Sequence, residues 1–236
     1  MCSSVRYGSA RWRCRAPRRH ERARCHGREP DRGLLNKTRF ESFSDGVFAF
    51  AATLLVLGFV LPVFSVPPSE SIMRSVLLHM WPNLIAYFLS FSVIGIMWHN
   101  HHALYHMVER IDRRTVFYNL MLLAVTAFIP FATSLLGAYP TMRPTTFLYG
   151  LTLTAASTAY NVMLNHLVSS RAFAPEVGEA TIRGTIFAYR VGWVTYAVAM
   201  LVSLLAPLVS FALYVAITIF YLIPRGLDTD AGARAR

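Results

Sequence analysis

Apolar residues dominate the chain from residue 43 onward, in stretches that short polar segments interrupt. A membrane-spanning helix needs roughly 20 mostly apolar residues, and six stretches reach or approach that length. They cover residues 43–64, 76–98, 116–138, 145–167, 185–205 and 208–223. Only Ala206 and Pro207 separate the last two stretches, which indicates a tight hairpin between helices. The pattern therefore predicts an all-α integral membrane protein with six transmembrane helices.

Charged residues are scarce, and most of the basic ones lie near the N-terminus. The chain is 55% hydrophobic and 15% charged, whereas soluble domains average about 25% charged residues. Residues 1–39 contain eleven arginines and one lysine of the 23 basic residues. We expect residues 1–36 to form a disordered basic tail, residues 37–224 the six-helix membrane domain, and residues 225–236 a short C-terminal tail.

The net charge of +11 is compatible with two kinds of partner, nucleic acid and membrane lipid. In a soluble protein it would suggest a nucleic-acid partner, but next to a membrane helix the positive-inside rule and contact with lipid headgroups explain it better. We therefore expect membrane lipids, not nucleic acid, as the partner of this charge. The three cysteines of the tail have no zinc-site spacing.

The distribution of arginines among the connecting segments predicts the orientation of the helices. The second and fourth connections and the C-terminal tail carry most of the remaining basic residues, namely Arg110, Arg113, Arg114, Arg171, Arg183, Arg225, Arg234 and Arg236. The first and third connections carry only Arg74 and Arg143, and the fifth carries none. By the positive-inside rule, both termini are expected in the cytoplasm.

Polar residues gather at the predicted cytoplasmic ends of the first two helices. Arg39, Ser44 and Asp45 precede or begin the first helix. A histidine cluster ends the second helix, in which His99, His102 and His106 share one face. Three roles are open for the cluster: a metal site, polar side chains at a wet helix end, or hydrogen-bond partners for a buried Arg39–Asp45 ion pair.

Four motifs of these helices resemble one known family. They are R-x-x-x-F-S-D at residues 39–45, which includes Phe43, then G-V-F-A at 46–49, T-L-L-V-L at 53–57, and W-x-x-H-H at 98–102, which includes Trp98, His101 and His102. The chain is similar over residues 37–223 to the prokaryotic branch of the transmembrane protein 175 family, whose animal members are lysosomal potassium channels. The first motif is long and unusual, so chance is a poor explanation for it.

The resemblance implies a potassium-selective, leak-like channel in a prokaryotic plasma membrane. It implies a pore without a re-entrant loop, lined by the first helix, with potassium as the permeant ion and with no cofactor or bound metal. Animal members carry two six-helix units per chain and dimerise. Because this chain carries one unit, a homotetramer is implied, as the cyclic symmetry of a central pore also requires.

Phe50, Thr53, Leu54 and Leu57 form one stripe of the first helix. A stripe of this kind usually packs against another helix, but the resemblance assigns it to the pore axis. Rings of large apolar side chains gate by dewetting, and nearby hydroxyls replace ion hydration. Phe50 departs from the family, which usually has isoleucine or leucine at that position. Arg39, Phe43, Ser44, Asp45, Trp98, His101 and His102 are expected to form a structural network instead.

Two alternatives belong to other functional classes. A proton-coupled secondary transporter would use Asp45, Arg39 and the histidines at 99–106 as a relay, although such transporters favour paired repeats and broken helices. A metal-dependent membrane oxidase would use the histidine cluster. The chain has no soluble-type catalytic motif, and we expect it not to be an enzyme.

Overall fold

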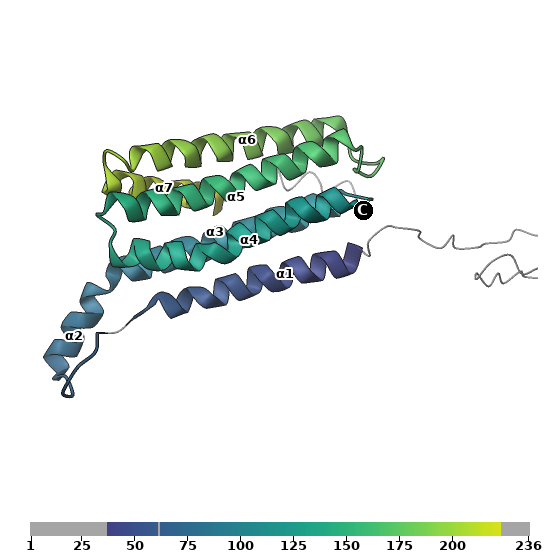
Figure 1. Cartoon of the computed structure of the whole chain (residues 1–236). Helices are drawn as coiled ribbons and strands as arrows, with labels where there is room; N and C mark the ends of the chain where they lie inside the picture. The colour runs from purple at the N-terminus through teal and green to yellow at the C-terminus, as the bar shows by residue number, and fades with distance from the viewer. Residues whose placement is uncertain (1–36, 61, 223–236) are drawn as a thin grey trace, which may run out of the picture. The chain divides into compact units, whose positions relative to one another are not determined.

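The computed structural model describes residues 37–60 and 62–222, and all regular elements in these ranges are helices (Figure 1). The predicted tails at residues 1–36 and 225–236 lie outside the described residues. The helices are α1 (Lys37–Leu54), the 3₁₀ helix η1 (Leu55–Gly58), α2 (Glu70–His79), α3 (Trp81–His106), α4 (Arg113–Ala138), α5 (Arg143–Ser169), α6 (Glu179–Val202) and α7 (Pro207–Leu222).

The first helix is shorter than the apolar pattern predicts. The chain leaves regular helix at Gly58, six residues before the predicted end at residue 64, so that boundary is wrong. Gly58 approaches α4 so closely that an added Cβ would lie 3.2 Å from the Cβ of Ser134. Pro62, Pro67 and Pro68 follow, and none of them can donate a helical hydrogen bond. An apolar segment thus continues after the helix ends.

The predicted second helix is two helices in the structure. The short helix α2 begins after Ser69, whose hydroxyl accepts a hydrogen bond from the Ile72 amide at 3.4 Å. Glu70 in its first turn and His79 in its last turn suit the helix dipole. The long helix α3 then begins at Trp81, with Pro82 in its first turn. It continues to His106, eight residues beyond the predicted end.

Helix α4 packs against α1, η1, α3 and α5. Helix α6 packs against α5 and α7, and α1 packs against α3 and α4, so α1 and α6 lie on opposite sides of these helices (Figure 1). Polar side chains bond across the contacts. Thr133 of α4 donates to the Ser90 hydroxyl of α3 at 2.7 Å, and Ser90 lies 2.9 Å from the Tyr149 hydroxyl of α5. Such bonds commonly join membrane helices.

Four of the described helices are long and apolar enough to cross a membrane: Lys37–Gly58, Trp81–His106, Arg113–Ala138 and Glu179–Val202. Helix α5 has 27 residues, but its many threonine and asparagine side chains reduce its hydropathy. Helix α7 is apolar but has only 16 residues. The hairpin at Ala206 and Pro207 is present, because α6 ends at Val202 and α7 begins at Pro207.

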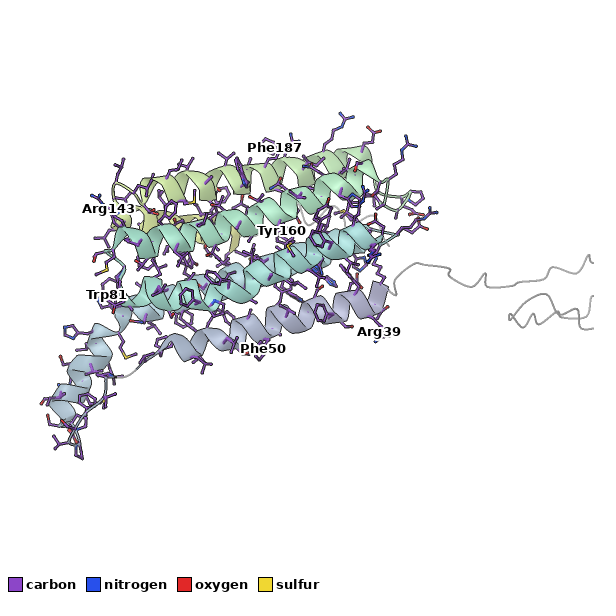
Figure 2. The ribbon with its side chains drawn as sticks, in the orientation of Figure 1. Arg39, Phe50, Trp81, Arg143, Tyr160 and Phe187 are labelled. Carbon is purple, nitrogen blue, oxygen red and sulfur yellow. The ribbon has the colours of Figure 1, made fainter. Side chains whose placement is uncertain are left out.

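One end of the bundle, which we call the basic end, contains the start of α1 and the loops at residues 107–112 and 170–178 (Figure 1). The two loops bond to each other. The Glu109 amide donates to the Ala172 carbonyl and the Ala174 amide to the Met107 carbonyl, both at 2.9 Å. Arg171, in the second of these loops, has a positive φ of 51°. Figure 2 shows Arg39 at this end and Arg143 at the other end.

Candidate functional site

A buried polar cluster joins α1, α3 and α4 near the basic end. Ser44, His101 and Asn119 are each at most 1% exposed. The Ser44 hydroxyl donates to the Phe40 carbonyl at 3.1 Å and accepts from the Asn119 amide nitrogen at 2.9 Å. Because Asn119 directs its nitrogen at Ser44, its oxygen faces His101 Nε2, 2.9 Å away. His101 therefore carries its proton on Nε2 and donates it to Asn119.

Aromatic rings enclose His101 within this cluster. Its ring centroid lies 5.3 Å from that of Phe48 and 4.6 Å from that of Tyr105. Every polar atom named in the cluster has a partner, as buried groups in an apolar medium require. The cluster therefore fixes the rotation of α1 about its own axis relative to α3 and α4.

Asp45 lies beside this cluster and bonds to α3. Its carboxylate accepts a hydrogen bond from the Trp98 indole nitrogen at 3.0 Å. The Trp98 ring in turn stacks on His102, with centroids 6.0 Å apart and an angle of 21° between the ring planes. The structure thus places Asp45 and Trp98 at the contact between α1 and α3, while Ser44 bonds to α4.

The sequence analysis considers a buried ion pair between Arg39 and Asp45, but within one chain neither residue is buried. Arg39 is exposed and Asp45 is only half-buried. The two positions are six residues apart on one helix, so they lie on different faces of it. Phe43 is also outside the cluster, since it is 56% exposed.

Asn119 is the member of the cluster that the sequence interpretation missed. It lies in the predicted span at residues 116–138, and it shares a helix face with the buried residues Leu122 and Thr126, at i+3 and i+7. An amide on the buried face of an apolar helix needs a partner. That position is the signal that would have identified it.

The exposed face of α1 contains the residues that the sequence assigns to a pore. Phe50 is 64% and Leu57 70% exposed, Thr53 is also exposed, and Leu54 is half-buried. The opposite face of the helix is buried through Phe48, Ala51 and Leu55. Figure 2 shows Phe50 on the side of α1 that faces away from the other helices. A hollow beside it is lined by Ser42, Phe43, Gly46, Val47, Phe50, Ala51, Leu54 and Ala127.

Thr53 has one hydroxyl proton, which it donates to the Phe50 carbonyl at 2.8 Å. The oxygen of that hydroxyl keeps its lone pairs directed away from the helix backbone. An exposed oxygen with free lone pairs can coordinate a cation.

The start of α1 is attached to the loops of the basic end. The Lys37 ammonium donates to the Val108 carbonyl at 2.7 Å. In the same loop Asp112 caps α4, because its carboxylate accepts from the Thr115 amide at 2.8 Å and hydroxyl at 2.6 Å. His166 Nε2 of α5 lies 3.0 Å from the same carboxylate. Partial burial raises the pKa of Asp112, but the hydrogen bonds from Thr115 and His166 outweigh it and lower that pKa below its ordinary value.

The other histidines near the end of α3 lie outside the buried polar cluster. His102 and His106 are in edge-to-face contact, with centroids 5.6 Å apart, and His99 is exposed. Among the residues that the structure describes, no group of three His, Cys, Asp or Glu side chains is arranged to bind a metal ion.

Known proteins resemble the chain in sequence and in structure. Residues 39–130 match the family described as "Endosomal/lysosomal potassium channel TMEM175". A Streptomyces collinus protein named "Potassium channel B446_29190" is 32% identical over 188 residues, which cover 78% of this chain and 90% of that protein.

Two crystal structures share the fold. One is a lysosomal potassium-selective channel TMEM175 homologue from Chamaesiphon minutus, 31% identical, with a TM-score of 0.69 over 79% of this chain and 96% of that one. The other is the potassium channel MtTMEM175 in a T38A variant, 20% identical, with a TM-score of 0.55 over 82% and 96% of the two chains. The second likeness concerns the fold alone.

Proposed function

Because the chain belongs to the TMEM175 family of endosomal/lysosomal potassium channels, we propose that it forms a potassium-selective, leak-like channel in which α1 lines a central pore. The observation that supports this most directly is the division of α1 into two faces. One face is buried and bonded through Ser44. The other exposes Phe50 and Thr53 and continues into η1 with the exposed Leu57.

Six crossings and a homotetramer complete the proposal. Helices α5 and α7 would cross together with the four helices that are long and apolar enough by themselves, so the termini and the basic end would face the cytoplasm. One α1 per chain cannot enclose a pore, whereas four copies around an axis can. The measured mass of the purified protein in nanodiscs tests this assembly, and a monomer that conducts would contradict it.

Phe50, Leu54 and Leu57 would form the narrow part of the pore. Each turn of α-helix advances about 5.4 Å, so the three positions would cover roughly 10 Å of apolar wall. A water-filled path of that kind empties easily, because its wall offers no hydrogen bonds. Thr53, within the same stretch, would offer the oxygen ligands that partly replace the hydration of potassium.

Flux from liposomes tests the proposal. Purified protein should pass potassium down its gradient and pass sodium more slowly. Thr53→Val keeps the shape of the side chain and removes its oxygen, so it should lower the ratio of potassium to sodium flux. Thr181→Val, at an exposed site in the first turn of α6, is the matched control and should leave the ratio unchanged. Absence of flux from a correctly assembled protein would contradict channel function.

The proton-coupled transporter is the alternative, and the polar cluster weighs against it. The chain of bonds from His101 through Asn119 and Ser44 ends at the Phe40 carbonyl, which cannot carry a proton further. Asp45 bonds to the Trp98 indole, which is a donor only. These partners support a structural role for both groups. Proton-driven uptake that is lost in Asp45→Asn would favour the transporter.

A further inference from the structure

Arg190 is a charged residue in the middle of an apolar helix. It lies in α6, one of the helices able to cross a membrane, and it is exposed. It makes no hydrogen bond or ion pair with any other residue that the structure describes. Arg183, two turns closer to the basic end on the same face, is bonded to Glu179 at 2.8 Å. A charge within a membrane span ordinarily has a partner, so the partner of Arg190 lies beyond the residues that the structure describes.

The hairpin after α6 indicates how deep Arg190 lies. Leu205, in the hairpin, is 83% exposed, which places the hairpin within or close to the hydrocarbon layer. Arg190 is 15 residues before Leu205, or about 22 Å along a helix, in a layer about 30 Å thick. Its backbone is therefore inside the layer, near the boundary at the basic end, and its long side chain can extend to the headgroups there.

The face of α6 that carries Arg190 is directed away from α1. Helix α6 packs against α5 and α7, on the side of the bundle opposite α1 (Figure 1). Figure 2 shows Phe187, which lies between Arg183 and Arg190 on this face, directed outward from the other helices. If α1 surrounds a pore, as proposed above, this face of α6 meets lipid. Its other exposed residues agree, since they include Val194, Val198 and Leu201.

We propose that Arg190 binds the phosphate of an anionic phospholipid on the cytoplasmic side of the membrane, with Arg183 as a second contact. A guanidinium offers paired N–H donors that match two phosphate oxygens. The acyl chains would lie along the apolar residues that follow Arg190 on α6. A lipid with net negative charge is favoured over a zwitterionic one, because the choline or ethanolamine group of the latter already neutralises its phosphate.

Trp193 provides a fluorescent reporter at this site. It lies three residues after Arg190 on α6, is 41% exposed, and is fixed by a hydrogen bond from its indole to the Thr158 hydroxyl at 2.9 Å. Brominated acyl chains quench tryptophan on contact. The assembled protein would be placed in phosphatidylcholine vesicles containing small amounts of brominated phosphatidylglycerol or brominated phosphatidylcholine. The quenching that Trp193→Phe removes is the signal of this site.

Brominated phosphatidylglycerol should quench Trp193 more strongly, with a preference of about fivefold for one arginine near the surface. Arg190→Gln should abolish the preference and Arg190→Lys should retain most of it. Arg143→Gln, at an exposed arginine at the opposite end of the bundle, is the matched control and should leave it intact.

Equal quenching by the two lipids in the unmodified protein would overturn the proposal, and so would a preference that survives Arg190→Gln. A third outcome that overturns it is loss of the oligomer in Arg190→Gln, because Arg190 would then meet a group of a neighbouring subunit. The quenching is independent of ion flux, so its result is separate from the test of channel function.

Discussion

Helices α1 and α6 both lie at the surface of the bundle, yet their exposed faces differ in chemistry. The exposed face of α1 alternates large apolar residues with small or polar ones, such as Ser42, Gly46 and Thr53. The exposed face of α6 is small and polar in its first turns, where Thr181 and Gly184 are exposed, and from Phe187 onward it is mostly large and apolar apart from Arg190, with residues such as Val198. Exposure alone therefore does not distinguish the face proposed to line a pore from the face proposed to meet lipid. The two faces differ in the share of small and polar side chains, in α6 from Phe187 onward.

The largest expected effect concerns the attachment of α1 to its neighbours. Asn119→Leu removes the acceptor of the His101 N–H and leaves that buried donor without a partner, so it should lower the free energy of unfolding by about 2–3 kcal/mol. Val198→Ala on α6 should change it by less than about 0.5 kcal/mol, as surface changes usually do. Thermal unfolding of purified protein, followed by size-exclusion chromatography, measures both. Equal stability of the two variants would mean that the cluster does not hold α1.

Phe50 tests the difference between the two exposed faces. Phe50→Ala should raise potassium flux per folded assembly by about tenfold, which corresponds to ~1.4 kcal/mol of barrier. Phe50→Asn should raise the potassium flux further, because an amide offers hydrogen bonds to water in the narrow part of the proposed pore. Phe187→Ala on α6 is the matched control, since Phe187 is 71% exposed and Phe50 64%. Liposome flux normalised to folded protein is the measurement.

Selectivity for potassium over sodium should fall in both Phe50 variants if the ring restricts hydrated ions. Because Phe50 is exposed within one chain, its removal opens no cavity in the subunit. Unchanged or reduced flux in both variants would exclude Phe50 from the gate. An equal increase in Phe187→Ala would remove the distinction between the two helices.

Asp45→Asn should have a smaller effect, a loss of about 1 kcal/mol of stability. The sequence alone predicts a larger loss, of roughly 3–5 kcal/mol, because it assumes a buried ion pair. In the structure Asp45 is half-buried, and an asparagine oxygen can still accept from the Trp98 indole. A double-mutant cycle with Trp98→Phe measures the bond. Altered ion preference at normal stability would instead place Asp45 in the ion path.

The smallest expected effect is a dependence of stability on acidic pH through Asp112. The pKa of Asp112 is lower in the folded protein than its ordinary value of about 3.9. Its contribution to stability is therefore present above about pH 3.9 and is lost as the pH falls through the lowered pKa. Hydrogen exchange at the Ala172 and Ala174 amides should become faster in that range. Asp112→Asn, which still caps α4, should remove this dependence, whereas Glu176→Gln in the neighbouring loop should keep it.

The hydropathy pattern predicts the long helices well, because a membrane helix is defined mainly by apolar length. It fails at the boundaries near residues 58–80. There, the first helix ends at Gly58, where the chain approaches Ser134 of α4 closely, and the Ser69 cap begins a short helix with no buried residue. The close approach of Gly58 to Ser134 is visible only in the three-dimensional structure. The start of the short helix is visible in the sequence as Ser69 followed by Glu70 after two prolines.

The polar cluster could be predicted in part. The motifs at residues 39–45 and 98–102 place Ser44, Asp45, Trp98 and His101 near one another, and the structure brings these four side chains to the region where α1, α3 and α4 meet. Their pairing could not be predicted, since it depends on Asn119 from a third helix. The roles of Phe50, Thr53, Leu54 and Leu57 in a pore remain predictions.

The tighter winding at the end of α1 changes the direction in which Leu57 points. A 3₁₀ helix turns about 120° per residue and an α-helix about 100°, and residues 55–58 follow the first. Over the three residues from Leu54 to Leu57 the difference accumulates to roughly 60°. Leu57 therefore has nearly the same azimuth as Leu54, where uninterrupted α-helix would have separated the two. If this single turn rewound from 3₁₀ helix to α-helix, the Leu57 side chain would rotate about the helix axis while Phe50 stayed in place.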